Sequence, residues 1–121
     1  MTIIAAVPDS PEGIWALSAG VREAKILGTD LVVVNLGLRA LDIGGLDQSV
    51  AVTVVDRTGR DDRDPVDAVL DEIRDRKATR LVIGVKRRSA VGKALLGSVS
   101  QSLLLNSPVP VLAVKVADGD E

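Results

Sequence analysis

The chain of 121 residues contains no cysteine, histidine, tyrosine or phenylalanine, and only one tryptophan. Without cysteine there is neither a disulfide framework nor thiolate chemistry. Without histidine the usual general base and the commonest metal ligand are missing. The scarcity of aromatic side chains also argues against recognition of single-stranded nucleic acid by base stacking.

Neither sign of charge dominates, because 15 Lys and Arg residues face 17 Asp and Glu residues, for a net charge of −2. This balance argues against a protein that binds the nucleic-acid backbone. No apolar run approaches the roughly 18 residues of a membrane span, and no N-terminal apolar segment precedes a cleavage site. We therefore expect a cytoplasmic protein that binds neither nucleic acid nor membrane.

The hydrophobic residues are mainly aliphatic and form short continuous runs, as in parallel strands that are buried on both faces. These runs are residues 2–7, 31–36, 51–55, 81–84 and 109–116. Helices are expected to begin at Ser10-Pro11, at Asp64-Pro65 and at Gly97 or Ser98. In the first helix, the residues that recur at helical spacing predict the face that packs on the sheet, and they are Ile14, Leu17, Val21, Ala24 and Leu27.

Alternating strands and helices predict an α/β fold, a parallel sheet with helices on both faces. Residues 1–116 form one domain in this interpretation, and residues 117–121 are an acidic C-terminal tail. Residues 37–50 show no period and predict a long loop between the second and third strands. Pro108 and Pro110 limit pairing at the start of the last strand, so we expect its apolar edge to pair with a second copy.

The candidate site begins where the fourth strand is expected to end, at Gly84. The basic residues Lys86, Arg87, Arg88 and Lys93 follow, and Gly97-Ser98 then opens the last helix. Glycine permits close approach of a ligand to the backbone, and a helix N-terminus offers unpaired N–H groups and partial positive charge. This segment is therefore either a phosphate site or a plain connection between strand and helix. It is not a P-loop, because Arg87 and Ala94 occupy the positions of required residues.

A second loop is expected at the same edge of the sheet, where ligands bind beyond the carboxyl ends of the strands. That loop is Pro8-Asp9-Ser10, which would lie beside Gly84. Asp9 and Ser10 are turn and cap residues or ligand contacts, and Ser98 is a helix N-cap, a ligand contact or both. With no histidine and no converging pair of acids, we expect no efficient catalytic turnover.

The segment from Leu81-Val-Ile-Gly84 to Gly97-Ser98-Val99-Ser100, together with Ser107-Pro-Val-Pro-Val-Leu112, resembles the universal stress protein family. The family pattern is glycine, two residues, glycine, nine residues, then glycine with serine or threonine. The resemblance implies a five-stranded parallel sheet of order 3-2-1-4-5, similar to the adenine nucleotide alpha hydrolases. The connection between strands two and three would be shortened, and a homodimer would form through the last strand, Val111 to Val116.

The resemblance further implies a regulatory domain that binds ATP or a related adenine nucleotide in the stress response. It would act through an unidentified protein partner, and any Mg²⁺ would be held chiefly by the phosphates. The implied nucleotide-binding residues are Val7, Pro8, Asp9, Ser10, Leu36, Gly84, Lys86, Arg87, Arg88, Gly97, Ser98 and Val99. Of these, the residues up to Leu36 would contact the adenosine end, and those from Gly84 onward would contact the phosphates.

Two departures from the family pattern support a second hypothesis. The acidic residue that follows the first strand in the family falls on Pro8 here, with Asp9 as its neighbour. The middle glycine falls on Arg87, which would be strained at positive φ or would fold over a phosphate as a charged donor. The second hypothesis is a dimeric interaction module of the same fold that binds no nucleotide and contacts an acidic partner through the basic loop 86–93.

Overall fold

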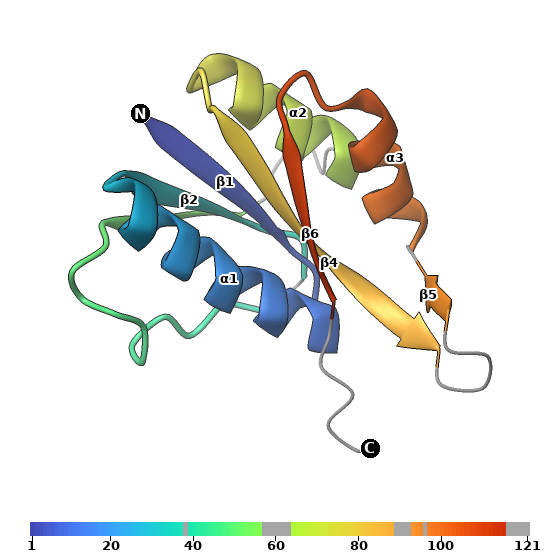
Figure 1. Ribbon diagram of the computed structural model, residues 1–121, viewed down its shortest axis with the longest axis horizontal. Helices are drawn as coiled ribbons and strands as arrows, with labels where there is room; N and C mark the ends of the chain where they lie inside the picture. Colours follow the sequence, from blue (N-terminus) through green and yellow to red (C-terminus); the bar gives the residue numbers. More distant parts are fainter. Residues whose placement is uncertain (38, 57–63, 89–92, 96, 116–121) are drawn as a thin grey trace.

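The computed structural model describes residues 1–37, 39–56, 64–88, 93–95 and 97–115, with the backbone alone for 86–88 and 93–95. Three helices and six strands follow one another along these residues (Figure 1). They are β1 (Thr2–Val7), α1 (Pro11–Leu27), β2 (Asp30–Asn35), β3 (Val52–Asp56), α2 (Pro65–Asp75), β4 (Arg80–Arg88), β5 (Lys93–Leu95), α3 (Ser98–Asn106) and β6 (Val111–Lys115).

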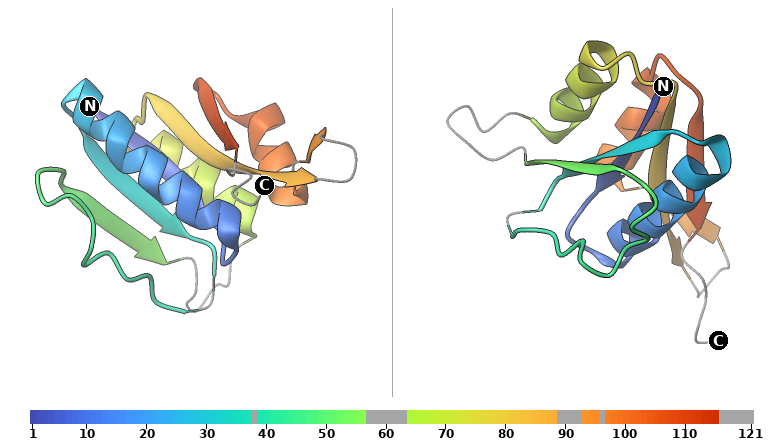
Figure 2. Two further views of the ribbon diagram at one scale, coloured as in Figure 1. Left: turned by 60° about the horizontal axis from the view of Figure 1, so that its bottom comes forward. Right: turned by 90° about the vertical axis from the view of Figure 1, so that its left-hand side faces the viewer.

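Five parallel strands form the main sheet in the order β3-β2-β1-β4-β6. This is the predicted order 3-2-1-4-5, with β6 as the fifth parallel strand. Helix α1 covers one face of the sheet, and α2 and α3 cover the other (Figure 2). No helix in the described ranges is long and apolar enough to cross a membrane.

The core lies on both faces of the sheet, as the continuous apolar runs predict. In β1, Ile3 and Ala5 pack in the cluster beneath α1, whereas Ile4 and Ala6 pack in the cluster beneath α2 and α3. Successive side chains of a strand point to opposite faces, so a strand covered on both sides needs apolar residues throughout. The buried sheet therefore explains why residues 2–7 show no alternation.

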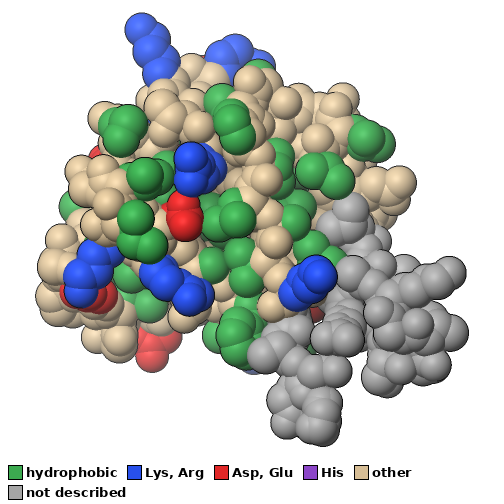
Figure 3. Space-filling model, in the orientation of Figure 1, with side chains coloured by type: hydrophobic (Ala, Val, Ile, Leu, Met, Phe, Trp, Pro, Cys, Tyr) green, Lys and Arg blue, Asp and Glu red, His purple; other side chains and the backbone are tan. Residues whose placement is uncertain are grey.

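Helix α1 begins and ends where the sequence predicts. Ser10 is its N-cap in an extended conformation, although its side chain makes no capping bond, and Gly28 ends it with φ of 65°. Leu17, Val21 and Ala24 are buried against the sheet. The prediction is wrong for Ile14, which is 70 % exposed because it borders an open cavity, described below, instead of a strand. It is also wrong for Leu27, which is exposed at the last residue of the helix. Figure 3 shows hydrophobic side chains at the surface on this face.

Strand β4 is longer than predicted. It continues past Gly84 to Arg88 and pairs antiparallel with β5, placing Arg88 opposite Lys93. The prediction of a strand that ends at Gly84, followed by a basic loop, is therefore wrong. Gly84 keeps its place in the ladder opposite Val114 of β6, so a glycine here does not end the strand. The far end of β4 projects beyond the other strands, with β5 beside it (Figure 1).

The connection between β2 and β3 contains no helix in its described residues, 36, 37 and 39–51, which confirms the shortened connection. Leu41 and Leu46 pack against the core cluster beneath α1. Lys25 of α1 holds the connection through an ion pair of 2.7 Å with Asp47. Hydrogen bonds from Lys25 and then from Ser49 hold the pKa of Asp47 well below its usual range. The carboxylate is thus ionised at neutral pH, and the tie weakens only in strong acid.

Candidate functional site

Eight of the twelve predicted site residues border two separate cavities at the carboxyl edge of the sheet, and Pro8 borders both. One cavity lies toward α3 and is called the α3 cavity below. The other lies toward α1 and is called the α1 cavity. The single site that the sequence predicts is therefore divided by the loop that follows β1.

The α3 cavity has a volume of about 360 Å³. It lies where the end of β1, the residue after β2 and the N-termini of all three helices meet. Its described lining residues are Ala6, Pro8, Glu12, Leu36, Pro65, Gly97, Ser98, Val99, Ser100 and Leu103. The wall is mainly apolar, with helix backbone at one end, which suits a ligand that has both an apolar ring and an anionic group.

The N-terminus of α3 supplies the polar end of this cavity. Gly97 is the N-cap, and its carbonyl accepts the first helical hydrogen bond from Gln101 at 2.9 Å. Ser98 is the first helical residue, so the prediction that it is the N-cap is wrong; Gly97 adopts the extended conformation that this position needs. The first turn contains no acidic residue. Its N–H groups lack intrahelical acceptors and can bind an anion.

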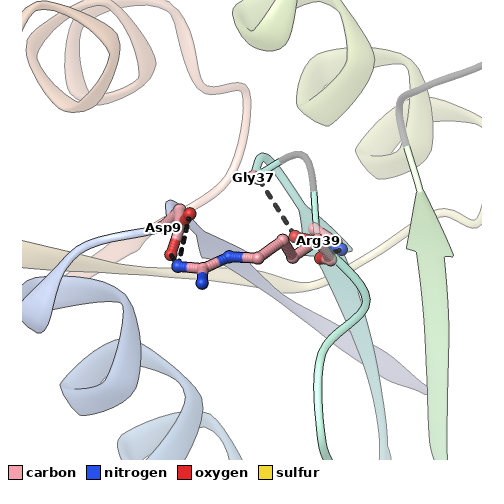
Figure 4. Close-up of polar contacts among 4 residues, drawn as sticks. Asp9, Gly37 and Arg39 are labelled. Carbon is pink, nitrogen blue, oxygen red and sulfur yellow. Dashed lines mark hydrogen bonds and ion pairs between the residues drawn. The ribbon is translucent and has the colours of Figure 1, made fainter.

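The α1 cavity, of about 500 Å³, lies between the first turns of α1 and the segment that follows β2. Its described lining residues are Val7, Pro8, Asp9, Ser10, Pro11, Ile14, Leu17, Asn35, Gly37, Arg39, Ala40 and Leu41. Arg39 reaches across to Asp9 with contacts of 3.3 Å to both carboxylate oxygens (Figure 4). Both side chains are more than half exposed, so this pair adds little stability.

Asn35 organises the boundary between the two cavities. It is 3 % exposed, and its amide donates to the carbonyl of Arg39 at 2.8 Å and to Asp56 at 2.9 Å. Its side-chain oxygen accepts from the N–H of Gly37 at 3.0 Å. These bonds fix the turn that places Leu36 in the α3 cavity and Gly37 in the α1 cavity. Sequence reasoning missed Asn35, although a lone amide at the end of an apolar run was a usable signal.

The α3 cavity brings together five of the residues that the sequence predicts for nucleotide binding. These are Pro8, Leu36, Gly97, Ser98 and Val99. Three others, Val7, Asp9 and Ser10, border the α1 cavity instead. The hairpin of β4 and β5 contains Lys86, Arg87 and Arg88, for which the structure describes only the backbone.

Gly84 borders neither cavity. A Cβ atom built on it would lie 2.2 Å from the carbonyl oxygen of Glu12, so its close approach is to the backbone of α1. Glu12 is the acidic residue that borders the α3 cavity, whereas Asp9, the neighbour of Pro8, borders the α1 cavity. Among the residues described, no cluster of acidic side chains is arranged to hold a metal ion.

Known proteins resemble this chain in sequence and in architecture. The family model of the universal stress protein family matches residues 35–115. A universal stress protein of Mycolicibacterium smegmatis is 35 % identical over 128 aligned positions, which cover 93 % of this chain and 96 % of that protein.

Two solved structures from Archaeoglobus fulgidus have the same fold. One is a universal stress protein with 26 % identity and a TM-score of 0.71, covering 95 % of this chain and 98 % of its own. The other is a universal stress protein in complex with dAMP, with 20 % identity, a TM-score of 0.64 and the same coverage. The match of the family model and the identity to the mycobacterial relative together establish that this chain belongs to the universal stress protein family.

Proposed function

We propose that the chain is a regulatory domain that binds an adenine nucleotide in the α3 cavity and acts through a protein partner instead of by turnover. The observation that carries this proposal is the meeting of Leu36, Pro8 and the N-terminus of α3 around one cavity. The dAMP complex of the Archaeoglobus fulgidus protein, which has the same fold, supports an adenine nucleotide as the ligand.

The cavity walls suggest how such a ligand would lie. The base would pack on Leu36 and Pro8, and the phosphate would accept hydrogen bonds from the first N–H groups of α3 at Ser98 and Val99. Magnesium, where ATP is the ligand, would be held chiefly by the phosphates. Such a site binds and orients a nucleotide without a general base to activate water.

Substitution of Gly97 by valine is expected to weaken adenine nucleotide binding at least about tenfold, because side-chain bulk then enters the anion end of the cavity. No atom lies within 4 Å of the position of a Cβ on Gly97, so the fold is expected to tolerate the change. Calorimetric titration with AMP and ATP measures the effect. With one tryptophan and no tyrosine, the protein absorbs weakly, so co-purified adenine is also visible in the ultraviolet spectrum.

The matched control for this experiment is Gly45→Val, at a second glycine whose Cβ position has no atom within 4 Å. Gly45 lies in the connection between β2 and β3, outside the α3 cavity, so this variant should bind like the natural chain. Equal affinity of the natural chain and Gly97→Val would refute the α3 cavity as the site. A chain that neither retains nor binds any adenine nucleotide would refute the function.

The hairpin of β4 and β5 supports a second candidate function, an interaction module that contacts an acidic partner. Its backbone register places Arg88 opposite Lys93 and sets Lys86 and Arg87 two and one positions before Arg88 on the same strand. Four cationic residues are thus concentrated in one short hairpin that projects from the sheet (Figure 1). Complementary charge of this kind steers association with acidic surfaces. Loss of the nucleotide function would make this candidate the preferred one.

We further propose that two copies pair through β6. This strand pairs with β4 alone among the strands described, and Val111, Leu112 and Val114 along it are only half-buried. An open edge with apolar side chains is suited to pairing with an identical edge.

Substitution of the exposed Ala113 of β6 by aspartate is expected to weaken such a dimer at least about tenfold, since two like charges would meet across the two-fold axis. Sedimentation velocity over a concentration series measures the change. Thr53→Asp, at an exposed position of the opposite edge strand β3, is the matched control and should leave the association unchanged. A natural chain that sediments as a monomer throughout the series would refute the dimer.

A further inference from the structure

Glu12 is the one charged side chain among the described residues that line the α3 cavity. It lies in the first turn of α1 and is partly buried. Its carboxylate makes no hydrogen bond or ion pair within the described ranges, whereas Glu23, Glu72, Asp9 and Asp47 each have a cationic partner. A carboxylate at the wall of a cavity repels further negative charge that enters it.

Glu12 lies toward the same end of the cavity as α3. The backbone and Cβ of Glu12 pack against Gly84, where a built Cβ would lie 2.9 Å from that of Glu12. The carbonyl of Gly84 in turn lies 3.5 Å from the hydroxyl of Ser100, in the first turn of α3. Glu12 and the first turn of α3 therefore both contact Gly84, which places residue Glu12 near the end of the cavity that would take phosphate.

We propose that Glu12 sets the charge selectivity of the α3 cavity, which takes adenosine or its monophosphate in preference to the triphosphate. This inference rests on the proposed nucleotide function. Each helix N-terminus at the cavity carries a partial positive charge of about half an elementary charge, so the carboxylate of Glu12 cancels much of the attraction that these N-termini offer to an anion. A monophosphate can accept hydrogen bonds from the N–H groups of α3 and carries less negative charge than a triphosphate. The two additional phosphates of a triphosphate would add negative charge near Glu12.

The size of the cavity points to the same ligand class. Its volume of about 360 Å³ is near the lower end of the range of roughly 300–1,000 Å³ for small-molecule sites. Such a volume suits a nucleoside or nucleoside monophosphate better than a triphosphate with its metal. Charge and size are independent properties, and both favour the ligand with fewer phosphates.

The experiment compares the natural chain with Glu12→Gln, which keeps the shape of the side chain and removes its charge. Affinities for adenosine, AMP and ATP are measured by calorimetry at one low salt concentration. The natural chain is expected to bind AMP about tenfold more tightly than ATP. Glu12→Gln should tighten ATP binding about tenfold and change adenosine binding less than about twofold, because adenosine carries no charge for the carboxylate to repel.

Asp75→Asn is the matched control, since Asp75 is an exposed acid at the end of α2, outside the α3 cavity, with no ion pair among the described residues. It removes the same charge and should leave all three affinities unchanged. Equal thermal midpoints of the variants would show that both remain folded. Tighter binding of ATP than of AMP by the natural chain would overturn the inference while leaving nucleotide binding intact. So would unchanged ATP affinity in Glu12→Gln. Absence of binding to all three ligands would overturn the proposed function and this inference together.

Discussion

Substitution of Gly84 by alanine is expected to lower the free energy of unfolding by about 2–3 kcal/mol. The added Cβ would lie 2.2 Å from the carbonyl oxygen of Glu12 and 2.9 Å from its carbonyl carbon. Both atoms belong to the backbone of α1, so no rotation of a side chain relieves the contact, and the helix must move away from β4. Chemical denaturation, followed by circular dichroism, measures the loss.

Gly97→Ala provides the comparison, because Gly97 is the other glycine of the same motif. Its φ is −65°, and a Cβ there meets no atom within 4 Å. Stability should fall by less than about 1 kcal/mol, because alanine is a poorer N-cap than glycine but meets no steric obstacle here. Equal and small losses in both variants would contradict the close packing of α1 on β4. The two glycines would then have the same role.

This contrast shows what the motif predicts and what it leaves open. In the sequence, Gly84 and Gly97 are alike, since each lies at the predicted boundary of a strand or helix. In the structure, Gly84 makes room for the first turn of α1, whereas Gly97 borders the cavity. The spacing between glycines in a sequence can indicate only that the backbone at these positions lies close to another group. Whether that neighbour is a ligand or another helix depends on tertiary packing, which local pattern does not encode.

Most of the fold was predictable because its signals are local. Continuous apolar runs predict strands buried on both faces, and Ser10-Pro11 and Asp64-Pro65 predict helix starts through the preference of proline for the first helical turn. The end of β4 was not predictable in this way. Residues 86–88 extend where β5 returns to pair with them, and that pairing joins residues up to nine positions apart. A polar segment of this kind has no burial pattern to indicate a strand.

The location of the candidate site could be predicted from the sequence, but its division into two cavities could not. Topology places the loops after β1 and β2 at one edge, and both indeed border cavities there. Which side chain enters which cavity depends on the direction of the chain after each strand. Asp9 turns toward Arg39, and Glu12, three residues later, borders the α3 cavity. Asp9, the neighbour of Pro8, therefore does not supply an acidic side chain to the α3 cavity.

The last prediction concerns the turn that separates the two cavities. Asn35→Asp is expected to lower the free energy of unfolding by about 3 kcal/mol at neutral pH, as expected for an uncompensated buried charge. The new carboxylate would replace the amide that donates to Asp56 at 2.9 Å and to the carbonyl of Arg39 at 2.8 Å. Three acceptors would then face one another at a site that is 3 % exposed. Only the bond from the N–H of Gly37, at 3.0 Å, would remain.

The same change should make stability depend on pH in a direction that identifies its cause. Burial and the nearby carboxylate of Asp56 would raise the pKa of an aspartate at position 35 in the folded chain above its unfolded value of about 3.9. The folded state then binds the proton more tightly, so the loss is greatest near neutrality and shrinks as the pH falls through the raised pKa. Gln48→Glu, which adds the same charge at an exposed position between β2 and β3, should show neither effect. Thermal midpoints of both variants measured between about pH 7 and pH 5 decide the matter, because a loss caused by a rearranged turn alone would not recover in acid. Recovery of the thermal midpoint in acid would show that position 35 requires an uncharged hydrogen-bond donor. The two bonds that the Asn35 amide donates would then be what fixes the turn between the two cavities.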